Sequence, residues 1–237
     1  MNAKINKLTR FIDLGIKDYR ETWDYQDSLF QKILSEKRSN QQLPPDQQTA
    51  TPNFLVFCEH PHVFTLGKSG DRQNLLVSEE TLESLKASYY QINRGGDITY
   101  HGPGQLVAYP ILDLENFFTD IHRYMRTLEE AVIQTLEHFG ISSGRIPGLT
   151  GVWMNAQKES RKICALGVKT SRWVTLHGLA LNVYPNLDYF QYIIPCGIQD
   201  KSVTSMEKEL GFAPDLEEVK KILKLKIGEL FEMEWES

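Results

Sequence analysis

The feature that most constrains the fold of this chain is a series of short apolar runs separated by glycine, proline and polar residues. The runs occupy residues 53–58, 89–93, 106–112, 151–154, 163–168, 173–183 and 191–194. Their length is typical of strands, and turn-forming residues bound several of them. The middle of the chain is therefore predicted to form a β-sheet.

Helical patterns lie on both sides of these runs. The clearest one ends before Gly140, a residue suited to a helix C-terminus, and has apolar residues at helical spacing: Ile121, Tyr124, Met125, Leu128, Val132, Leu136 and Phe139. Residues 19–34 and 216–235 show weaker helical patterns. The predicted class is α+β, with a mixed β-sheet core and flanking helices rather than a doubly wound nucleotide fold.

The length of 237 residues, 41% of them hydrophobic, predicts a single domain over residues 1–237. Within it, residues 50–228 are expected to form the catalytic core. Residues 1–49 are expected to form an N-terminal strand and helix extension, with an exposed polar loop at residues 39–48.

Composition restricts the function. A net charge of −5 argues against nucleic-acid binding, and no apolar run approaches the roughly 20 residues that a membrane span needs. The chain has three cysteines, Cys58, Cys164 and Cys196. This small and odd number argues against a disulfide framework. We therefore expect a cytoplasmic protein whose free thiols can react.

Residues 94–105 concentrate glycines with an arginine, an aspartate and a histidine. Glycine lets a backbone approach a ligand closely, so this segment could wrap the polar end of a substrate. Two consecutive hairpin turns would explain the glycines equally well. The density of polar groups between two apolar runs favours the binding loop.

Three single residues could carry chemistry, and each has a plainer explanation. Cys196 stands between proline and glycine in a stiff turn, where a thiol is accessible, although a lone cysteine usually packs as a small hydrophobe. Lys162 opens an apolar run, with Cys164 and Leu166 on its side of the strand by alternation. A lysine there is more often solvated. His177 is expected to be a buried core histidine with a hydrogen-bond partner.

A zinc site at Cys58, His60 and His62 is not expected.

Together these segments resemble the octanoyltransferases of lipoate biosynthesis, also called lipoyl(octanoyl) transferases. The matching segments, in the family's order over about 150 residues, are 59–61, 64–67, 94–105, 151–153, 162–168, 177–182 and 195–198. The resemblance implies the catalytic fold of lipoate and biotin protein ligases. It also implies a cysteine–lysine dyad, Cys196 and Lys162. The substrate-binding residues that it implies are Arg94, Gly95, Gly96, Asp97, Ile98, Thr99, Tyr100, His101, Ala165, Leu166, Gly167, Gly178, Leu179 and Ala180.

The reaction implied by the resemblance moves octanoate from octanoyl-acyl carrier protein to a lysine of a lipoyl domain through a cysteine thioester. The expected acceptors are the lipoyl domains of 2-oxoacid dehydrogenase complexes and the glycine cleavage H protein. Thioester exchange followed by amide formation needs no ATP, cofactor or metal, and no phosphate-binding loop is visible. Both partners tend to be acidic. We therefore expect a local basic rim drawn from Lys68, Arg72, Arg94, Lys158, Arg161, Lys162, Lys169 and Arg172.

Three alternatives stay open at this point. An ATP-dependent lipoate or biotin ligase could share the fold, and it would not need Cys196 as a nucleophile. A cysteine thioesterase could pair Cys196 with His101 or His177 and release free octanoate. A non-catalytic binder of lipoyl domains would have no reason to keep Cys196 and Lys162 together.

Overall fold

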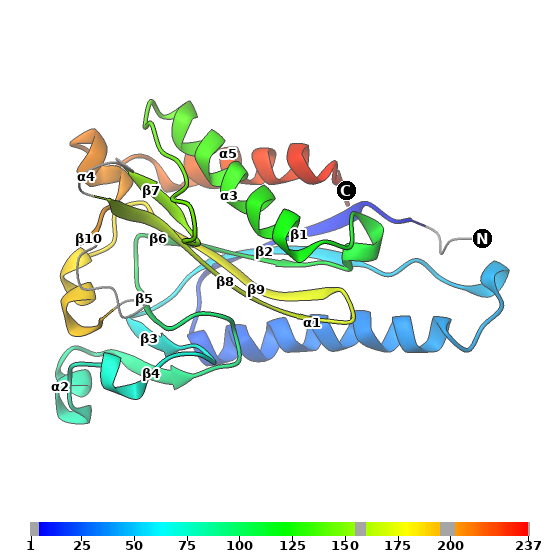
Figure 1. Cartoon of the computed structure of the whole chain (residues 1–237), viewed down its shortest axis with the longest axis horizontal. Helices are drawn as coiled ribbons and strands as arrows, with labels where there is room; N and C mark the ends of the chain where they lie inside the picture. The colour runs from blue at the N-terminus through cyan, green and yellow to red at the C-terminus, as the bar shows by residue number, and fades with distance from the viewer. Residues whose placement is uncertain (1–4, 155–159, 195–201, 237) are drawn as a thin grey trace.

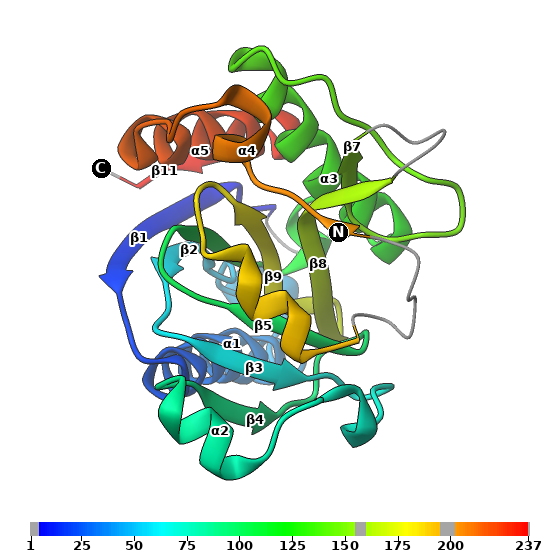
Figure 2. The ribbon, with the colours of Figure 1, turned by 90° about the vertical axis from the view of Figure 1, so that its left-hand side faces the viewer.

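A computed structural model describes residues 5–154, 160–194 and 202–236 of the chain. The molecule has a large mixed sheet with helices on both faces and a smaller sheet beside it (Figure 1). Turning the view shows the small sheet and its short helix packed below the edge of the large one (Figure 2). This architecture confirms the predicted α+β class. In the described part, no helix is long and apolar enough to cross a membrane.

The strands and helices alternate irregularly along the chain. The first half contains β1 (Leu8–Ile16), α1 (Tyr19–Asn40), η1 (Pro45–Gln47), β2 (Asn53–Glu59), β3 (Val63–Leu66), η2 (Arg72–Asn74), α2 (Glu79–Ser84), β4 (Ser88–Gln91), β5 (Ile98–His101) and β6 (Gln105–Ile111). The second half contains η3 (Leu114–Asn116), α3 (Ile121–His138), β7 (Val152–Met154), β8 (Arg161–Ser171), β9 (Val174–Asn182), η4 (Leu187–Tyr192), β10 (Ser202–Val203), α4 (Met206–Leu210), α5 (Leu216–Phe231) and β11 (Glu234–Trp235).

The large sheet has the strand order β10-β8-β9-β6-β2-β1-β11, and β7 pairs with β8. Its central strands β2, β6 and β9 are buried along their whole length, as expected for strands covered on both faces. Helices α3 and α5 close a core against one face, and α1 packs Phe30, Ile33 and Leu34 against the other. The sheet is thus held rigid from both sides.

The N-terminal segment is built into this arrangement. Strand β1 pairs in parallel with β2, so it lies within the large sheet. Asp18 caps the start of helix α1, because its side chain accepts hydrogen bonds from the backbone N–H groups of Arg20 and Glu21. Residues 41–47 are exposed, but helix α1 runs to Asn40, so the exposed segment is shorter than the loop expected at residues 39–48.

Helix α3 ends as the sequence predicted. Its buried residues recur on one face, and Gly140 follows with a φ of +76°, a left-handed conformation that glycine adopts without strain. Two other predictions need correction. Residues 191–194 do not form a strand, because η4 runs to Tyr192 and only Ile193 makes an isolated bridge, to Leu75. The last helix ends at Phe231, and Trp235 belongs to β11 beside β1.

Candidate active site

A cavity of about 410 Å³ lies between the loop that precedes β5 and the strands β8 and β9 of the large sheet. Apolar side chains, among them Met125, Leu149, Leu166 and Leu179, line part of its wall. Polar groups of Arg94, His101, Lys162 and His177 line the rest. A partly apolar cleft with a few convergent polar groups is the usual form of a small-molecule site.

The sequence-predicted binding residues meet at this cavity with one exception. Its lining includes Arg94, Gly95, Gly96, Asp97, Ile98, Thr99, His101, Ala165, Leu166, Gly167, Gly178, Leu179 and Ala180. Tyr100 does not line it. The Tyr100 ring is fully buried in the core of the small sheet, where it stacks on Tyr189. Alternation along β5 turns this side chain away from its neighbours Thr99 and His101.

Arg94 fixes the glycine-rich loop against both sheets. Its guanidinium donates to the carbonyl oxygen of Thr65 in β3 at 2.8 Å and to that of Gly95 at 3.0 Å. The N–H of Gly95 then donates to the carbonyl of Val168 in β8 at 3.0 Å. Arg94 is only 8% exposed, so the loop is preorganised from within rather than held by surface contacts.

Close approach of backbones explains two of the predicted glycines. A Cβ at Gly178 would lie 2.0 Å from the carbonyl oxygen of Ala108 in the adjacent strand, and one at Gly167 would lie 2.9 Å from that of Gly95. The family resemblance implied a substrate-binding role for both glycines. The structure shows that packing between backbones already requires glycine at both positions.

Lys162 lines the cavity from the start of β8. Its register partner is Trp153 of β7, and its Nζ atom lies 4.6 Å from the centroid of the Trp153 ring. A cation over an aromatic face is stabilised by the charge distribution of the ring. Lys162 is therefore held at the cavity wall, which is not the position of a freely solvated surface lysine.

A bulge corrects the predicted orientation of Cys164. Trp153 pairs with Lys162 and Val152 with Cys164, so β8 carries one extra residue between these pairs. Cys164 consequently packs in the core beneath α3 and does not share the side of Lys162. Burial raises the pKa of both Cys58 and Cys164, as expected for buried thiols that do not react.

Cys196 lies outside the described residues, as does Lys158. The described chain on either side of it is anchored. The N–H of Ile194 donates to the carbonyl of Asn74 at 2.9 Å, and β10 pairs in parallel with β8, with Val203 opposite Lys162. The chain that follows Cys196 therefore resumes on the strand next to Lys162.

The histidines of the site are neutral at physiological pH. Burial lowers the pKa of both His101 and His177 to about 3. The Nε2 atom of His177 lies 3.3 Å from Oδ1 of Asn93, which confirms a buried histidine with a hydrogen-bond partner. The His101 ring stacks on Tyr19 at a centroid distance of 5.9 Å.

The expected basic rim is only partly present among the described residues. Of the predicted cations, Arg94 and Lys162 line the cavity. Arg161 instead makes a two-pronged ion pair with Glu209, and Lys169 lies over the Phe30 ring. Of the predicted cations that the structure describes, Arg94 and Lys162 thus supply the positive charge that lines the cavity.

Sequence reasoning missed several residues that line the cavity: Tyr19, Gln105, Val107, Tyr109, Met125, Gly148, Leu149, Thr150, Trp153, Asn182, Phe190 and Val203. Gln105 and Asn182 are the last residues of segments 94–105 and 177–182, which were identified from the sequence. Their polar side chains at the ends of predicted strands could have been used to predict that they line the site. Tyr19 opens a helix far away in the sequence, and no local pattern connects it to the site.

The chain matches a family model described as the lipoyl protein ligase A/B catalytic domain over residues 18–228. An octanoyltransferase of Cytophaga hutchinsonii is 56% identical over 239 residues, covering 100% of this chain and 98% of the relative. One of Flavobacterium psychrophilum is 59% identical over 223 residues, covering 93% and 95%.

Two solved structures share the fold. Lipoate-protein ligase A bound with ATP has a TM-score of 0.73 at 16% identity, covering 97% of this chain and 88% of its own. A bipartite lipoate protein ligase from Thermoplasma acidophilum has a TM-score of 0.70 at 17% identity, covering 98% and 87%. On the family model and the close relatives, the chain belongs to the lipoyl protein ligase A/B catalytic-domain family, as one of its octanoyltransferases.

Proposed function

We propose that this octanoyltransferase takes its acyl group from octanoyl-acyl carrier protein and passes it, through a thioester on Cys196, to a lysine of a lipoyl domain. The observation that carries the proposal is the position of Lys162. This lysine lines the same cavity as the three glycine-containing segments, and the strand that follows Cys196 pairs with its own strand. The proposed acceptors are the lipoyl domains of 2-oxoacid dehydrogenase complexes and the glycine cleavage H protein.

In the first step, the Cys196 thiolate attacks the incoming thioester carbonyl and the bond to the carrier sulfur breaks. The carrier thiolate leaves with a proton from the Lys162 ammonium, which becomes neutral. Thiols with an ordinary pKa of about 8.5 are only partly ionised at neutral pH. An ammonium nearby favours the thiolate, which is the role proposed for Lys162. The acyl group is then stored at nearly unchanged free energy, because one thioester replaces another.

In the second step, the amine of the acceptor lysine attacks the Cys196 thioester. The C–N bond forms, the C–S bond breaks, and neutral Lys162 is proposed to take the proton released by the amine. An amide is more stable than a thioester, so no ATP is needed. The apolar wall at Leu149, Leu166 and Leu179 supports binding of the alkyl chain. Burying its six or seven methylenes contributes roughly 5 kcal/mol at most.

The fold alone does not separate a transferase from an ATP-dependent ligase, since lipoate-protein ligase A bound with ATP shares it. The close relatives favour transfer. A hydrolytic alternative would use His101 or His177 as the base, but histidines whose pKa is about 3 hold a proton poorly. The use of a free thiol also supports a reducing, cytoplasmic setting.

Intact-mass analysis after mixing the enzyme with octanoyl-acyl carrier protein, without ATP, tests the proposal. We expect the wild type to gain one octanoyl group that hydroxylamine removes. Cys196→Ala should gain none, whereas the matched control Cys164→Ala should still be acylated, because that thiol is buried in the core. An unmodified wild type, or an ATP requirement, would contradict the proposal.

A further inference from the structure

Gln105, the first residue of β6, joins two polar side chains of the cavity wall. It is 2% exposed, and its Oε1 atom lies 2.7 Å from Nδ1 of His101. Its Nε2 atom donates to the carbonyl of Tyr100 at 3.2 Å and to Oδ1 of Asn182 at 2.9 Å. The amide of Asn182 then donates to the carbonyl of Thr204 at 2.9 Å.

The backbone carbonyls of Tyr100 and Thr204 fix the direction of every hydrogen bond in this network. A carbonyl oxygen only accepts, so the Nδ2 atom of Asn182 must face Thr204, and its oxygen must face Gln105. The amide nitrogen of Gln105 must face Asn182 and Tyr100 for the same reason. The oxygen of Gln105 is therefore turned to His101, and Nδ1 of His101 must be the donor.

This direction determines the tautomer of His101. Burial lowers its pKa to about 3, so the ring carries one proton at neutral pH, and that proton is on Nδ1. Nε2 then holds a bare lone pair. It has no hydrogen-bond partner in the part of the chain that the structure describes, while the ring lines the cavity. His101 thus offers a bound group an acceptor and cannot offer it a donor.

The same chain of bonds reaches the strand of Lys162. Thr204 accepts from Asn182 through its carbonyl, and its own N–H donates to the carbonyl of Lys162 at 3.0 Å. The hydroxyl of Thr204 also donates to Glu209 at 2.5 Å, and Glu209 holds Arg161. The position of His101 is therefore coupled to that of Lys162 through three residues, Gln105, Asn182 and Thr204.

Among the reacting groups of the two substrates in the proposed reaction, only the acceptor amine brings N–H hydrogens to the cavity. The thioester carbonyl and sulfur only accept hydrogen bonds. We propose that Nε2 of His101 receives a hydrogen bond from the amine of the acceptor lysine and orients it for attack, and that Gln105 and Asn182 are positioning residues that fix the required tautomer. This inference rests on the proposed function and adds to it a residue that selects the nucleophile.

Nitrogen-15 NMR of the histidine rings tests the tautomer without any substrate. In the wild type we expect His101, assigned by its loss in His101→Gln, to be protonated at Nδ1 and bare at Nε2. Gln105→Met keeps the size of the side chain but removes its hydrogen-bonding oxygen and nitrogen. The proton of the His101 ring should then no longer be confined to Nδ1. The matched variant Gln105→Glu keeps an acceptor for Nδ1–H and should retain it. A wild-type ring protonated at Nε2 would overturn the proposal.

Single-turnover kinetics test the role in the reaction. In Gln105→Met we expect transfer from preformed octanoyl-enzyme to a lipoyl domain to slow about tenfold, the value of one ordinary hydrogen bond. Acylation of the enzyme should change less than about twofold, and Gln105→Glu should recover most of the transfer rate. Equal slowing of both steps would overturn the inference. An enzyme that never acquires octanoate would instead contradict the proposed function. The NMR measurement of the His101 tautomer needs no substrate, so it would still test the hydrogen-bond network.

Discussion

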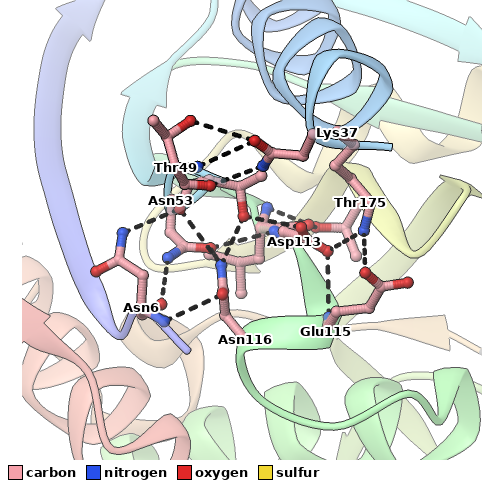
Figure 3. A network of polar contacts seen from close by, with 11 residues as sticks. Asn6, Lys37, Thr49, Asn53, Asp113, Glu115, Asn116 and Thr175 are labelled. Atoms are coloured by element: carbon pink, nitrogen blue, oxygen red, sulfur yellow. Dashed lines mark hydrogen bonds and ion pairs between the residues drawn. The ribbon is translucent and has the colours of Figure 1, made fainter. Parts of the chain in front are cut away.

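The two ends of strand β6 lie in buried polar networks of different kinds. At its start, Gln105 belongs to the neutral network of His101, Asn182 and Thr204. Beyond its end, Asp113 belongs to a charged network in which Nζ of Lys37 contacts its Oδ1 atom at 2.5 Å, and the hydroxyl of Thr51 donates to Oδ2 at 2.8 Å. Figure 3 shows how side chains from several elements converge on this second network.

The charged network is closed on itself. Besides Lys37, the carboxylate of Asp113 accepts from Thr51 and from the N–H of Glu115, and Asn116 ties Thr51 to Asn53. The neutral network ends instead on a bare nitrogen at the cavity. A buried ion pair therefore fixes the loop that follows β6, whereas amides with a defined direction hold the wall of the cavity. Rigidity and the proposed substrate recognition are thus separated along one strand.

Breaking the charged network should give the largest effect on stability. Lys37→Met leaves the Asp113 carboxylate, 4% exposed, without its cation. We expect a loss of about 3 kcal/mol in the free energy of unfolding, measured by urea titration, with little change in transfer rate per folded molecule. The control Lys226→Met removes a more exposed pair with Glu229 and should cost less than about 1 kcal/mol. Equal losses in the two variants would contradict the comparison.

Acid should act on the cavity end. The His60 ring lies 5.9 Å from that of His101, between ring centroids. Burial lowers the pKa of His60 to about 4 and that of His101 to about 3, below the roughly 6.5 of the unfolded chain. Below pH 6.5 the unfolded chain binds protons that the folded chain does not, so stability is full above that pH and falls as the pH drops. The loss should reach about 2 kcal/mol per histidine at pH 5.

Unfolding at pH 7 and pH 5 measures this loss. His60→Gln should lessen the drop in unfolding free energy by about 2 kcal/mol. The matched control His122→Gln changes an exposed histidine and should leave the drop as in the wild type. A drop that is the same in all three proteins would show that the buried histidines of the cavity end do not control acid stability.

The smallest effect is expected from the apolar wall of the cavity, which we propose to determine selectivity rather than stability. Met125 of α3 lines it, so Met125→Ala should enlarge the space for an alkyl chain. We expect the ratio of decanoyl to octanoyl transfer to rise roughly tenfold, because pockets discriminate single methylenes by only about 1–3 kcal/mol. Met125→Leu, with a side chain of similar volume, is the control. An unchanged ratio in Met125→Ala would place the alkyl chain elsewhere.

Much of the fold could be predicted because single elements carry their own signal. Helix α3 has regular apolar spacing and ends before Gly140, and β2 and β9 are apolar runs of strand length. The segments that line the cavity were expected from the family resemblance, and residues 94–105 also from their glycine-rich motif. What failed depended on partners distant in sequence. The bulge that turns Cys164 from Lys162 is defined by pairing with β7, and Tyr19 reaches the cavity only through helix packing.

The central claim is that Lys162 ionises the thiol of Cys196. The pH dependence of alkylation at Cys196, followed by peptide mass spectrometry, measures it directly. We predict that the wild-type thiol titrates below the usual value of about 8.5, and that Lys162→Met returns it to that value. Lys162→Arg should keep the low value because it keeps the charge. Superimposable alkylation profiles for the wild type and Lys162→Met would contradict the account.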